Sequence, residues 1–391
     1  MTAALFNSTD HRYMAEAIRL AWRGLYTTHP NPRVGCVLVK GSNVIGRGWH
    51  QVAGEGHAEV NALADAARNG HESQIKGATA YVSLEPCSHY GKTPPCAEAL
   101  IEAGVAKVIS AMEDPNPQVS GRGHRLLQQA GIETACGLMQ AEAEQINPGF
   151  NKRMRTGLPW VVLKSAMSVD GRTAMANGES QWITGAQARA DVQRLRARVE
   201  AIVTGVETVL SDDPSLTVRP AMWPTPLAGD DHANFSWPNG FEPIQPLRVI
   251  LDSQLRTPPS ASIFKQPGTT WVVCTQRDKQ KMAALQQAGA EVHWVPDRKG
   301  KIDLIALLQT LAEANVNDVL VETGAVLGGA FVEQKLVDEW VCYMAPKLMG
   351  SAARPVLSLP GIDTMAQVQS LSLKDCRQIG DDIRFTYSWN G

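Results

Sequence analysis

The sequence predicts a chain of two α/β domains. At 391 residues the chain is longer than one ordinary domain, and strand-like apolar runs alternate with helix-like patterns along both halves. The alternation is interrupted between Asn147 and Trp160, where basic residues stand among two glycines and two prolines. We therefore expect one domain over residues 1–150 and a second over residues 151–391.

The first half has the pattern of a mixed sheet. Apolar spacing predicts a helix over residues 10–24, with Asp10 as its N-cap and Gly24 as its stop. The apolar runs 34–40 and 43–50 are joined by turn residues and predict a β-hairpin. Alternating elements then predict parallel βαβ units. They are a helix at 57–69, a strand at 78–86, a helix at 96–104, a strand at 107–113, a helix at 124–131 and a strand at 132–136.

The second half repeats the alternation with longer strands. The expected strands lie at 160–171, 201–205, 247–253, 269–275, 291–296, 318–324 and 340–348, and the expected helices at 186–199, 279–289 and 303–316. Residues 220–246 contain Pro, Trp and Asn without periodicity, and they exceed the usual length of a loop. We interpret them as a variable surface excursion.

The composition fits a globular enzyme. The formal net charge of -2 gives no electrostatic reason to expect nucleic acid or an anionic membrane as a partner. No apolar run approaches the ~20 residues of a membrane span, and the N-terminus lacks a secretory pattern. Seven cysteines, an odd number, argue against a disulfide framework. We expect a cytoplasmic homo-oligomer, a dimer or a tetramer.

Four residues in the first half suggest a catalytic zinc site. His57, Cys87 and Cys96 offer three nitrogen and sulfur ligands, and catalytic zinc typically takes three and keeps a position for water. His57 and Cys96 each stand where a helix begins. The partial positive charge of a helix N-terminus favours the thiolate form of a cysteine such as Cys96. Because His57 is a capping residue, Glu59 can reach the same point and carry protons. H-x-E followed by P-C and a second cysteine is typical of zinc-dependent nucleobase deaminases.

Two other interpretations of these residues remain open. Cys87 and Cys96 could be buried small hydrophobic residues, with His57 only a helix cap. Alternatively, a structural site could take a fourth ligand from one of three further residues, which are Cys36, His50 and His89. The usual deaminase spacing is C-x-x-C, whereas eight residues intervene here. This insertion, "SHYGKTPP", adds a histidine and a lysine that could hold an anionic group of the substrate.

Motifs along nearly the whole chain resemble one family. "THPNPRVGCVLV", "GHAEVNAL", "LEPCSHYGKTPPC" and "DPNPQVSGRG" are similar to the deaminase half of the bifunctional riboflavin biosynthesis proteins of RibD type. "KSAMSVDGRTA", "GESQWIT", "SDDPSLTVR", "LRVILDS", "VETGAVLGGAF" and "YMAPKLMG" are similar to the reductase half. The resemblance implies a cytidine-deaminase-like three-layer α/β/α domain followed by a dihydrofolate-reductase-like α/β domain.

The resemblance also implies an activity and its site residues. A pyrimidine with a phosphoribosylamino arm would be deaminated with zinc at His57, Cys87 and Cys96 and with Glu59 as proton carrier. NADPH would then reduce the ribosyl arm to a ribityl chain. The deaminase substrate would be held by Asn31, His50, His89 and Lys92. The cofactor would contact Ala166, Trp182, Thr208, Asp212, Ser253, Gly324, Ala325, Val326, Leu327, Gly328, Gly329 and Ala330. The reductase substrate would contact Lys164, Ser180, Arg196, Leu216, Arg219 and Glu322.

The residues alone leave the second site open. The glycines of "DVLVETGAVLGGAF" either cradle phosphate with backbone amides at a helix start or allow tight packing there. Arginines on the helix at 186–199 form a solvated face, and only Arg196 is matched to a motif. Either Lys164 or Asp212 could relay a proton. The alternative function is a zinc deaminase of another base or nucleoside with a C-terminal nucleotide-binding or oligomerisation module.

Overall fold

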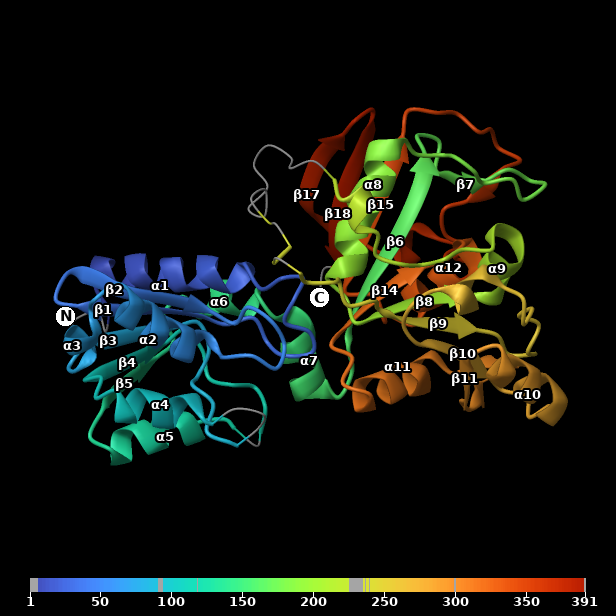
Figure 1. Ribbon diagram of the computed structural model, residues 1–391. Helices are drawn as coiled ribbons and strands as arrows, with labels where there is room; N and C mark the ends of the chain where they lie inside the picture. The colour runs from blue at the N-terminus through green and yellow to red at the C-terminus, as the bar shows by residue number, and fades with distance from the viewer. Residues whose placement is uncertain are drawn as a thin grey trace. The chain divides into compact units, whose positions relative to one another are not determined.

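The computed structural model describes residues 6–90, 94–117, 119–224, 235, 237–238, 240–298 and 300–389. The chain divides into two compact units, Met1–Gly157 and Leu158–Gly391, each built on its own sheet (Figure 1). The predicted boundary after residue 150 lies inside a helix, Pro148–Thr156, of the first unit. Among the described residues, no helix has both the length and the apolar character that crossing a bilayer requires.

The first unit begins with a hairpin and continues with parallel strands, as predicted. Its elements are α1 (Ser8–Trp22), β1 (Gly35–Lys40), β2 (Asn43–Trp49), α2 (Ala58–Arg68), α3 (Glu72–Ile75), β3 (Thr79–Val82), α4 (Cys96–Glu102), β4 (Lys107–Ser110), α5 (Arg122–Gln129), β5 (Glu133–Cys136), α6 (Gln140–Glu144) and α7 (Pro148–Thr156). The sheet order is β2-β1-β3-β4-β5. β1 pairs antiparallel with β2 and β3, whereas β3, β4 and β5 are parallel.

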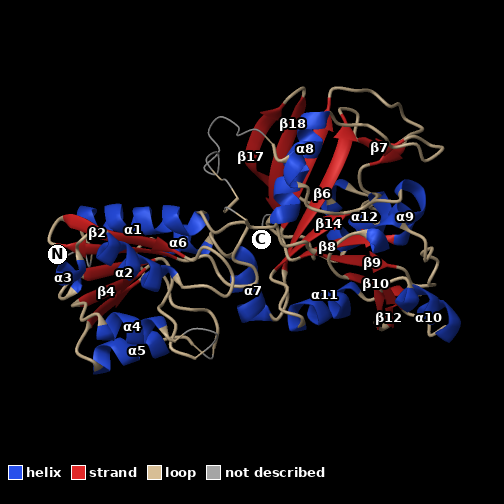
Figure 2. Cartoon of the chain, in the orientation of Figure 1, coloured by secondary structure: helices blue, strands red, loops and turns tan. Residues whose placement is uncertain are grey.

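Helices cover both faces of this sheet and confirm the three-layer prediction (Figure 2). One apolar cluster joins α1 and α6 to the sheet, and a second joins α2, α4 and α5 to the opposite face. Glycine brings α2 close to β2, because a Cβ on Gly48 would lie 2.2 Å from the carbonyl oxygen of Ala58. The start of α2, where His57 stands, is therefore fixed against the sheet.

The second unit contains a nine-stranded mixed sheet. Its elements are β6 (Trp160–Ser168), β7 (Arg172–Ala174), α8 (Ala186–Ala197), β8 (Ala201–Gly205), α9 (Val206–Asp212), η1 (Pro220–Met222), β9 (Leu247–Leu251), η2 (Ser262–Lys265), β10 (Thr270–Cys274), α10 (Lys279–Gln287), β11 (Ala290–Trp294), β12 (Asp297–Arg298), β13 (Lys301–Ile302), α11 (Leu304–Glu313), β14 (Asp318–Glu322), α12 (Ala325–Glu333), β15 (Glu339–Ala345), β16 (Arg354–Pro355), η3 (Met365–Gln367), β17 (Leu371–Ile379) and β18 (Asp382–Trp389). The order is β11-β10-β9-β8-β14-β6-β15-β18-β17.

This sheet is also covered on both faces. α11 and α12 pack on one face, and α8, α9 and α10 pack on the other (Figure 2). From β11 to β15 all neighbouring strands are parallel, so their carboxyl ends meet at one edge. In open α/β sheets this is the edge at which ligands bind.

The structure corrects several local predictions. Asp10 is not the N-cap of α1, because the Asn7 side chain accepts from the amides of Thr9 and Asp10, and Asp10 returns a capping-box bond. The helix ends at Trp22 with Arg23 as its C-cap, not at Gly24. The sequence prediction also missed the antiparallel β17–β18 hairpin that completes the second sheet.

Part of the predicted excursion at 220–246 is described. It includes η1 and a group of aromatic rings, in which the Trp223 ring centroid lies 5.7 Å from that of Phe235 and 4.9 Å from that of Trp237. These ring contacts join residues of the excursion to one another.

Candidate functional sites

Three predicted metal ligands meet in the first unit. His57 is the N-cap of α2, Cys96 is the first residue of α4, and Cys87 follows β3 in the intervening segment. Their ligand atoms all lie within 4.8 Å of one another. The Nδ1 atom of His57 is 3.6 Å from the Sγ of Cys87 and 3.3 Å from the Sγ of Cys96. The chain thus brings together residues that are far apart in sequence.

This donor set fits zinc. Bond lengths of about 2.3 Å to sulfur and about 2.0 Å to nitrogen in a tetrahedron separate the two donors by about 3.5 Å, close to the distances observed. In the part of the chain that the structure describes, no fourth histidine, cysteine or carboxylate joins the cluster. Cys36, His50 and His89 are therefore not its ligands. Three protein ligands are the number that a catalytic zinc site uses.

The electrostatics of the cluster favour a thiolate. A hydrogen bond from the Cys96 side chain, together with contacts from His57, lowers the pKa of the Cys87 thiol to about 4. The backbone amide of Cys96, at the start of α4, also donates to the Cys87 Sγ at 3.2 Å. These donors stabilise negative charge on the sulfur, which is the form that binds metal.

Glu59 lies beside this cluster, as predicted from its position two residues after the cap. It is 2% exposed, and its carboxylate interacts electrostatically with Cys87 and His57. Burial raises the pKa of Glu59 to about 7. A carboxyl group with that pKa can take up and release a proton at neutral pH.

Asn31 and His50 form one wall next to the cluster. The Asn31 Nδ2 lies 3.1 Å from the His50 Nε2, and the His50 Nδ1 lies 3.2 Å from the carbonyl oxygen of Gly56. Burial lowers the pKa of His50 to about 4, so its ring is neutral near pH 7. The ring centroid of His50 is 5.1 Å from that of His57. His89 is exposed beyond Cys87, and Lys92 lies outside the described residues.

A second charged group lies in the second unit. Glu322, the last residue of β14, is paired in register with Lys164 of β6. The Arg196 Nε and Nη2 donate to the two oxygens of Glu322 at 2.7 and 3.1 Å, and the Lys164 Nζ lies 3.9 Å from the Glu322 Oε2. Burial alone would raise the pKa of Glu322, but the charges of Arg196 and Lys164 outweigh it and lower this pKa. Burial lowers the pKa of Lys164.

The glycines after β14 have two different roles. Gly324 is the N-cap of α12 without any contact that a Cβ would disturb. Gly328 is buried, and its amide already donates to the Gly324 carbonyl oxygen at 3.1 Å. A Cβ on Gly329 would lie 1.9 Å from the Ser358 carbonyl oxygen. The close approach to Ser358 thus requires glycine at position 329, whereas the first turn, Gly324 to Leu327, presents the amides that have no intrahelical acceptor.

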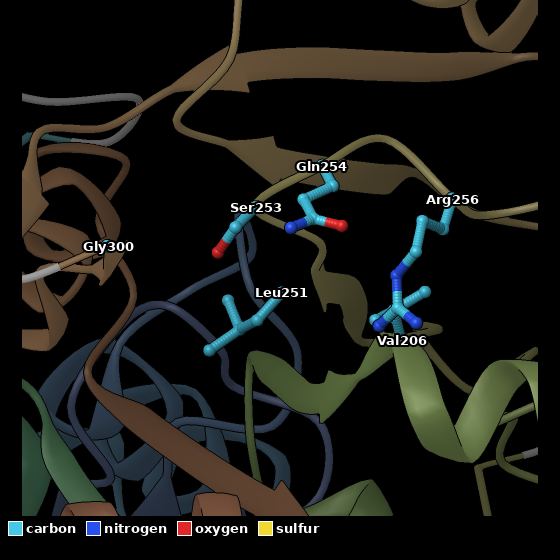
Figure 3. Close-up of a pocket in the computed structure, with 6 residues that line it drawn as sticks. All are labelled: Val206, Leu251, Ser253, Gln254, Arg256 and Gly300. Carbon is cyan, nitrogen blue, oxygen red and sulfur yellow. The ribbon is translucent and has the colours of Figure 1, made fainter.

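A cavity of about 350 Å³ opens at the carboxyl ends of β8 and β9. Figure 3 shows Ser253, Gln254 and Arg256 around it, with Val206 and Leu251. Ser253 is a predicted cofactor contact. Arg256 was not predicted, although an arginine shortly after a strand end is a signal for an anionic ligand, and here it pairs with Glu207.

The other predicted contacts lie on several elements. Thr208 and the exposed Asp212 are on α9, Ala166 is on β6, and the Trp182 ring is 63% exposed with the Arg189 guanidinium 4.5 Å from its centroid. Arg196 also donates to the carbonyl oxygen of Thr217, the neighbour of buried Leu216, at 3.1 Å. Arg219 is exposed and Ser180 is partly exposed. Of the two candidate proton carriers, the structure places Lys164, and not Asp212, against Glu322.

The first site and its fold define a zinc deaminase domain, joined in one chain to a second α/β unit that gathers charged and glycine-rich elements at the ligand-binding edge of its sheet. Residues 7–112 match the cytidine and deoxycytidylate deaminase zinc-binding region, and residues 159–385 match the RibD C-terminal domain. The riboflavin biosynthesis protein RibD of Escherichia coli (strain K12) is 50% identical over 374 residues, which cover 96% of this chain and 98% of that protein.

Two solved structures resemble the whole chain. RibD of Acinetobacter baumannii has a TM-score of 0.84 and 44% identity, covering 98% of this chain and 99% of that one. A diaminohydroxyphosphoribosylaminopyrimidine deaminase/5-amino-6-(5-phosphoribosylamino)uracil reductase of Thermotoga maritima has a TM-score of 0.80 and 27% identity, with the same coverage.

The chain belongs to the RibD family. It is a bifunctional riboflavin biosynthesis enzyme with a cytidine-deaminase-like domain and a dihydrofolate-reductase-like domain, and its cofactors are zinc and NADPH. The alternative of a deaminase whose second domain only binds or oligomerises is not supported.

Proposed function

We propose that the two activities use separate sites, one in each unit, and act in succession. The first would deaminate diaminohydroxyphosphoribosylaminopyrimidine at the cluster of His57, Cys87 and Cys96. The second would reduce the ribosyl arm of 5-amino-6-(5-phosphoribosylamino)uracil with NADPH near Lys164 and Glu322. The observation that carries the proposal is the three-ligand cluster with the buried carboxyl group of Glu59 against it.

In the deaminase site, each residue has a chemical task. Bound zinc supplies a Lewis acid that makes water nucleophilic at neutral pH. Glu59 takes a proton from the attacking water and delivers it to the departing amino group, as its pKa near 7 allows. Asn31 presents an amide that both donates to and accepts from a pyrimidine edge, and neutral His50 orients that amide. His89 and Lys92 are the proposed contacts of the phosphate.

In the proposed reductase site, several of the contacts lie at or just after the carboxyl ends of parallel strands. They are Thr208 after β8, Ser253 after β9 and Glu322 at the end of β14. The first turn of α12 would hold a cofactor phosphate on its free amides. The cavity beside Ser253 would take another part of the same cofactor. Arg196 would hold the Glu322 carboxylate for the substrate hydroxyls, and Lys164 would give a proton to the ring oxygen of the ribosyl group as the ring opens. Bound NADPH would supply the hydride for C1, which keeps its bond to nitrogen.

The phosphate cradle at α12 gives a matched test. Val326 is 68% exposed in the first turn, so Val326→Asp should fold normally but place a negative charge where the phosphate binds. We expect the KM for NADPH to rise about tenfold or more, which corresponds to the loss of ~1.4 kcal/mol of binding. Asparagine has nearly the same shape as aspartate without the charge. The KM for NADPH of Val326→Asn should therefore stay close to that of the unchanged protein. Equal effects of the two substitutions in steady-state reductase assays would exclude an electrostatic role of this turn.

One assay tests both activities. The purified protein is incubated with the phosphoribosylaminopyrimidine, with and without NADPH, while ammonia release and the absorbance of NADPH are followed separately. Ammonia should appear in both reactions, and NADPH should be consumed only after deamination has begun. Consumption of NADPH without prior ammonia release would contradict the order of the steps.

We also propose that the protein works as a homo-oligomer, a dimer or a tetramer, in the cytoplasm. All seven cysteines are free thiols, which suits a reducing compartment. The edge strand β17 carries Leu373, which is 56% exposed, and such an edge favours self-association. Light scattering on the purified protein measures the oligomeric state directly.

A further inference from the structure

Glu85 precedes the Pro86–Cys87 step and is 3% exposed. Its carboxylate accepts hydrogen bonds from four backbone amides of one downstream segment. These are the amides of Asp114 at 3.2 Å, Gly121 at 2.9 Å, Gly123 at 2.9 Å and His124 at 3.3 Å. Burying a carboxylate costs free energy unless hydrogen bonds compensate it, so this carboxylate and this segment hold each other in place.

The same carboxylate caps α5 from a distant part of the chain. Gly121 is the N-cap of α5 with φ 68°, and no side chain of its own caps that helix. A Cβ on Gly123 would lie 2.0 Å from the Pro86 carbonyl oxygen, so the first turn of α5 rests on the backbone next to Cys87. The position of α5 and the position of that backbone are therefore coupled through Glu85.

Both sides of the deaminase site depend on this contact. The Cys87 carbonyl oxygen accepts from the Ala97 amide of α4 at 3.2 Å, so Cys87 is held between α4 and the segment that Glu85 fixes. Asp114 is 7% exposed, its charge interacts with His89 and Cys87, and it lines a cavity of about 420 Å³. One carboxylate thus holds the backbone before a metal ligand and the backbone of Asp114, whose charge interacts with that ligand.

We propose that Glu85 is a positioning residue for deamination, which holds the Cys87 thiolate in place for zinc and holds Asp114 where its charge interacts with His89, a proposed substrate contact. It does not touch the reacting atoms; it acts through its four backbone donors. This inference rests on the proposed function of the cluster formed by His57, Cys87 and Cys96. Residues around the ligands of a metal commonly change metal affinity or activity by about 10–100-fold when they are replaced.

The test uses the full-length zinc-loaded protein and its Glu85→Gln variant. Glutamine keeps the size of the side chain but turns an amide NH2 toward backbone N–H groups. Zinc transfer to a chromophoric chelator should become about 10–100-fold faster. The deaminase KM should rise, added zinc should restore kcat while KM stays high, and the reductase rate should not change. Glu102→Gln, at an exposed position on α4 of the same unit, should behave like the unchanged protein.

A folded Glu85→Gln protein with unchanged zinc release and unchanged KM would overturn the proposal. If circular dichroism shows that this variant does not fold, zinc release and the deaminase KM are measured on Glu85→Asp instead. Aspartate keeps the charge, but its shorter side chain reaches the four donors less well. Failure of the proposed function is a different result. In that case the unchanged protein itself would keep releasing ammonia after complete removal of zinc.

Discussion

Glu59→Gln is expected to lower the turnover number of deamination by about 10²–10⁴-fold while the protein keeps its zinc. Glutamine has nearly the shape of the carboxyl group but cannot exchange a proton, and the native side chain is 2% exposed beside Cys87 and Cys96. Because glutamine is neutral, it adds no buried charge, and folding should be preserved. Ammonia release and zinc content, measured on the same preparation, check the two halves of the prediction.

Glu55→Gln is the matched control for this change. Glu55 is exposed in the segment before the α2 N-cap, so its replacement should leave ammonia release unchanged. The reductase rate should be the same in both variants, since Glu59 belongs to the other unit. A Glu59→Gln protein that deaminates at the normal rate would remove Glu59 from the mechanism, and loss of zinc would instead assign it to the metal site.

Arg196→Met is expected to abolish NADPH-dependent reduction and to lower the free energy of unfolding of the second unit by about 3–5 kcal/mol. The change leaves the Glu322 carboxylate buried without its bidentate partner, with the Lys164 Nζ 3.9 Å from its Oε2. Steady-state NADPH oxidation and denaturant unfolding measure the two effects. Deamination should continue at its normal rate.

A double variant separates stability from activity at this site. In Arg196→Met/Glu322→Gln the buried charge is removed, so much of the stability should return while reduction stays absent. Arg198→Met, at the C-cap of the same helix, breaks a partly exposed pair with Glu339 and should cost no more than about 1 kcal/mol. Reduction by a folded Arg196→Met protein would show that this arginine is only structural.

The sequence predicted the site best where the functional residues stand in short motifs. His57 stands at a helix start, Glu59 is the second residue of that helix, and the two thiols each follow a proline. The structure brings these four residues together. The alternation of apolar runs likewise predicted both sheets, because each strand must bury its side chains against a covering helix.

The sequence was least informative where a residue has a partner far along the chain. Glu85 stands 29 positions before the nearest of its four donors, and nothing in its own segment indicates them. The glycines after β14 predict either a phosphate cradle or tight packing, and the backbone of Ser358, the close neighbour of Gly329, is not indicated by that segment. The N-cap of α1 was also predicted wrongly. Asn7 and Asp10 are both residue types that favour an N-cap, and only the geometry of the first turn distinguishes them.

Lys164 and Glu322 face each other because two parallel strands pair in one particular register. A slip of a single residue along that ladder would place the two side chains on opposite faces of the sheet. The spacing of Lys164 and Glu322, the proposed centre of reduction, is thus a property of the central strands and not of a loop. Heat inactivation of reduction should consequently coincide with cooperative melting of the second unit and should not precede it.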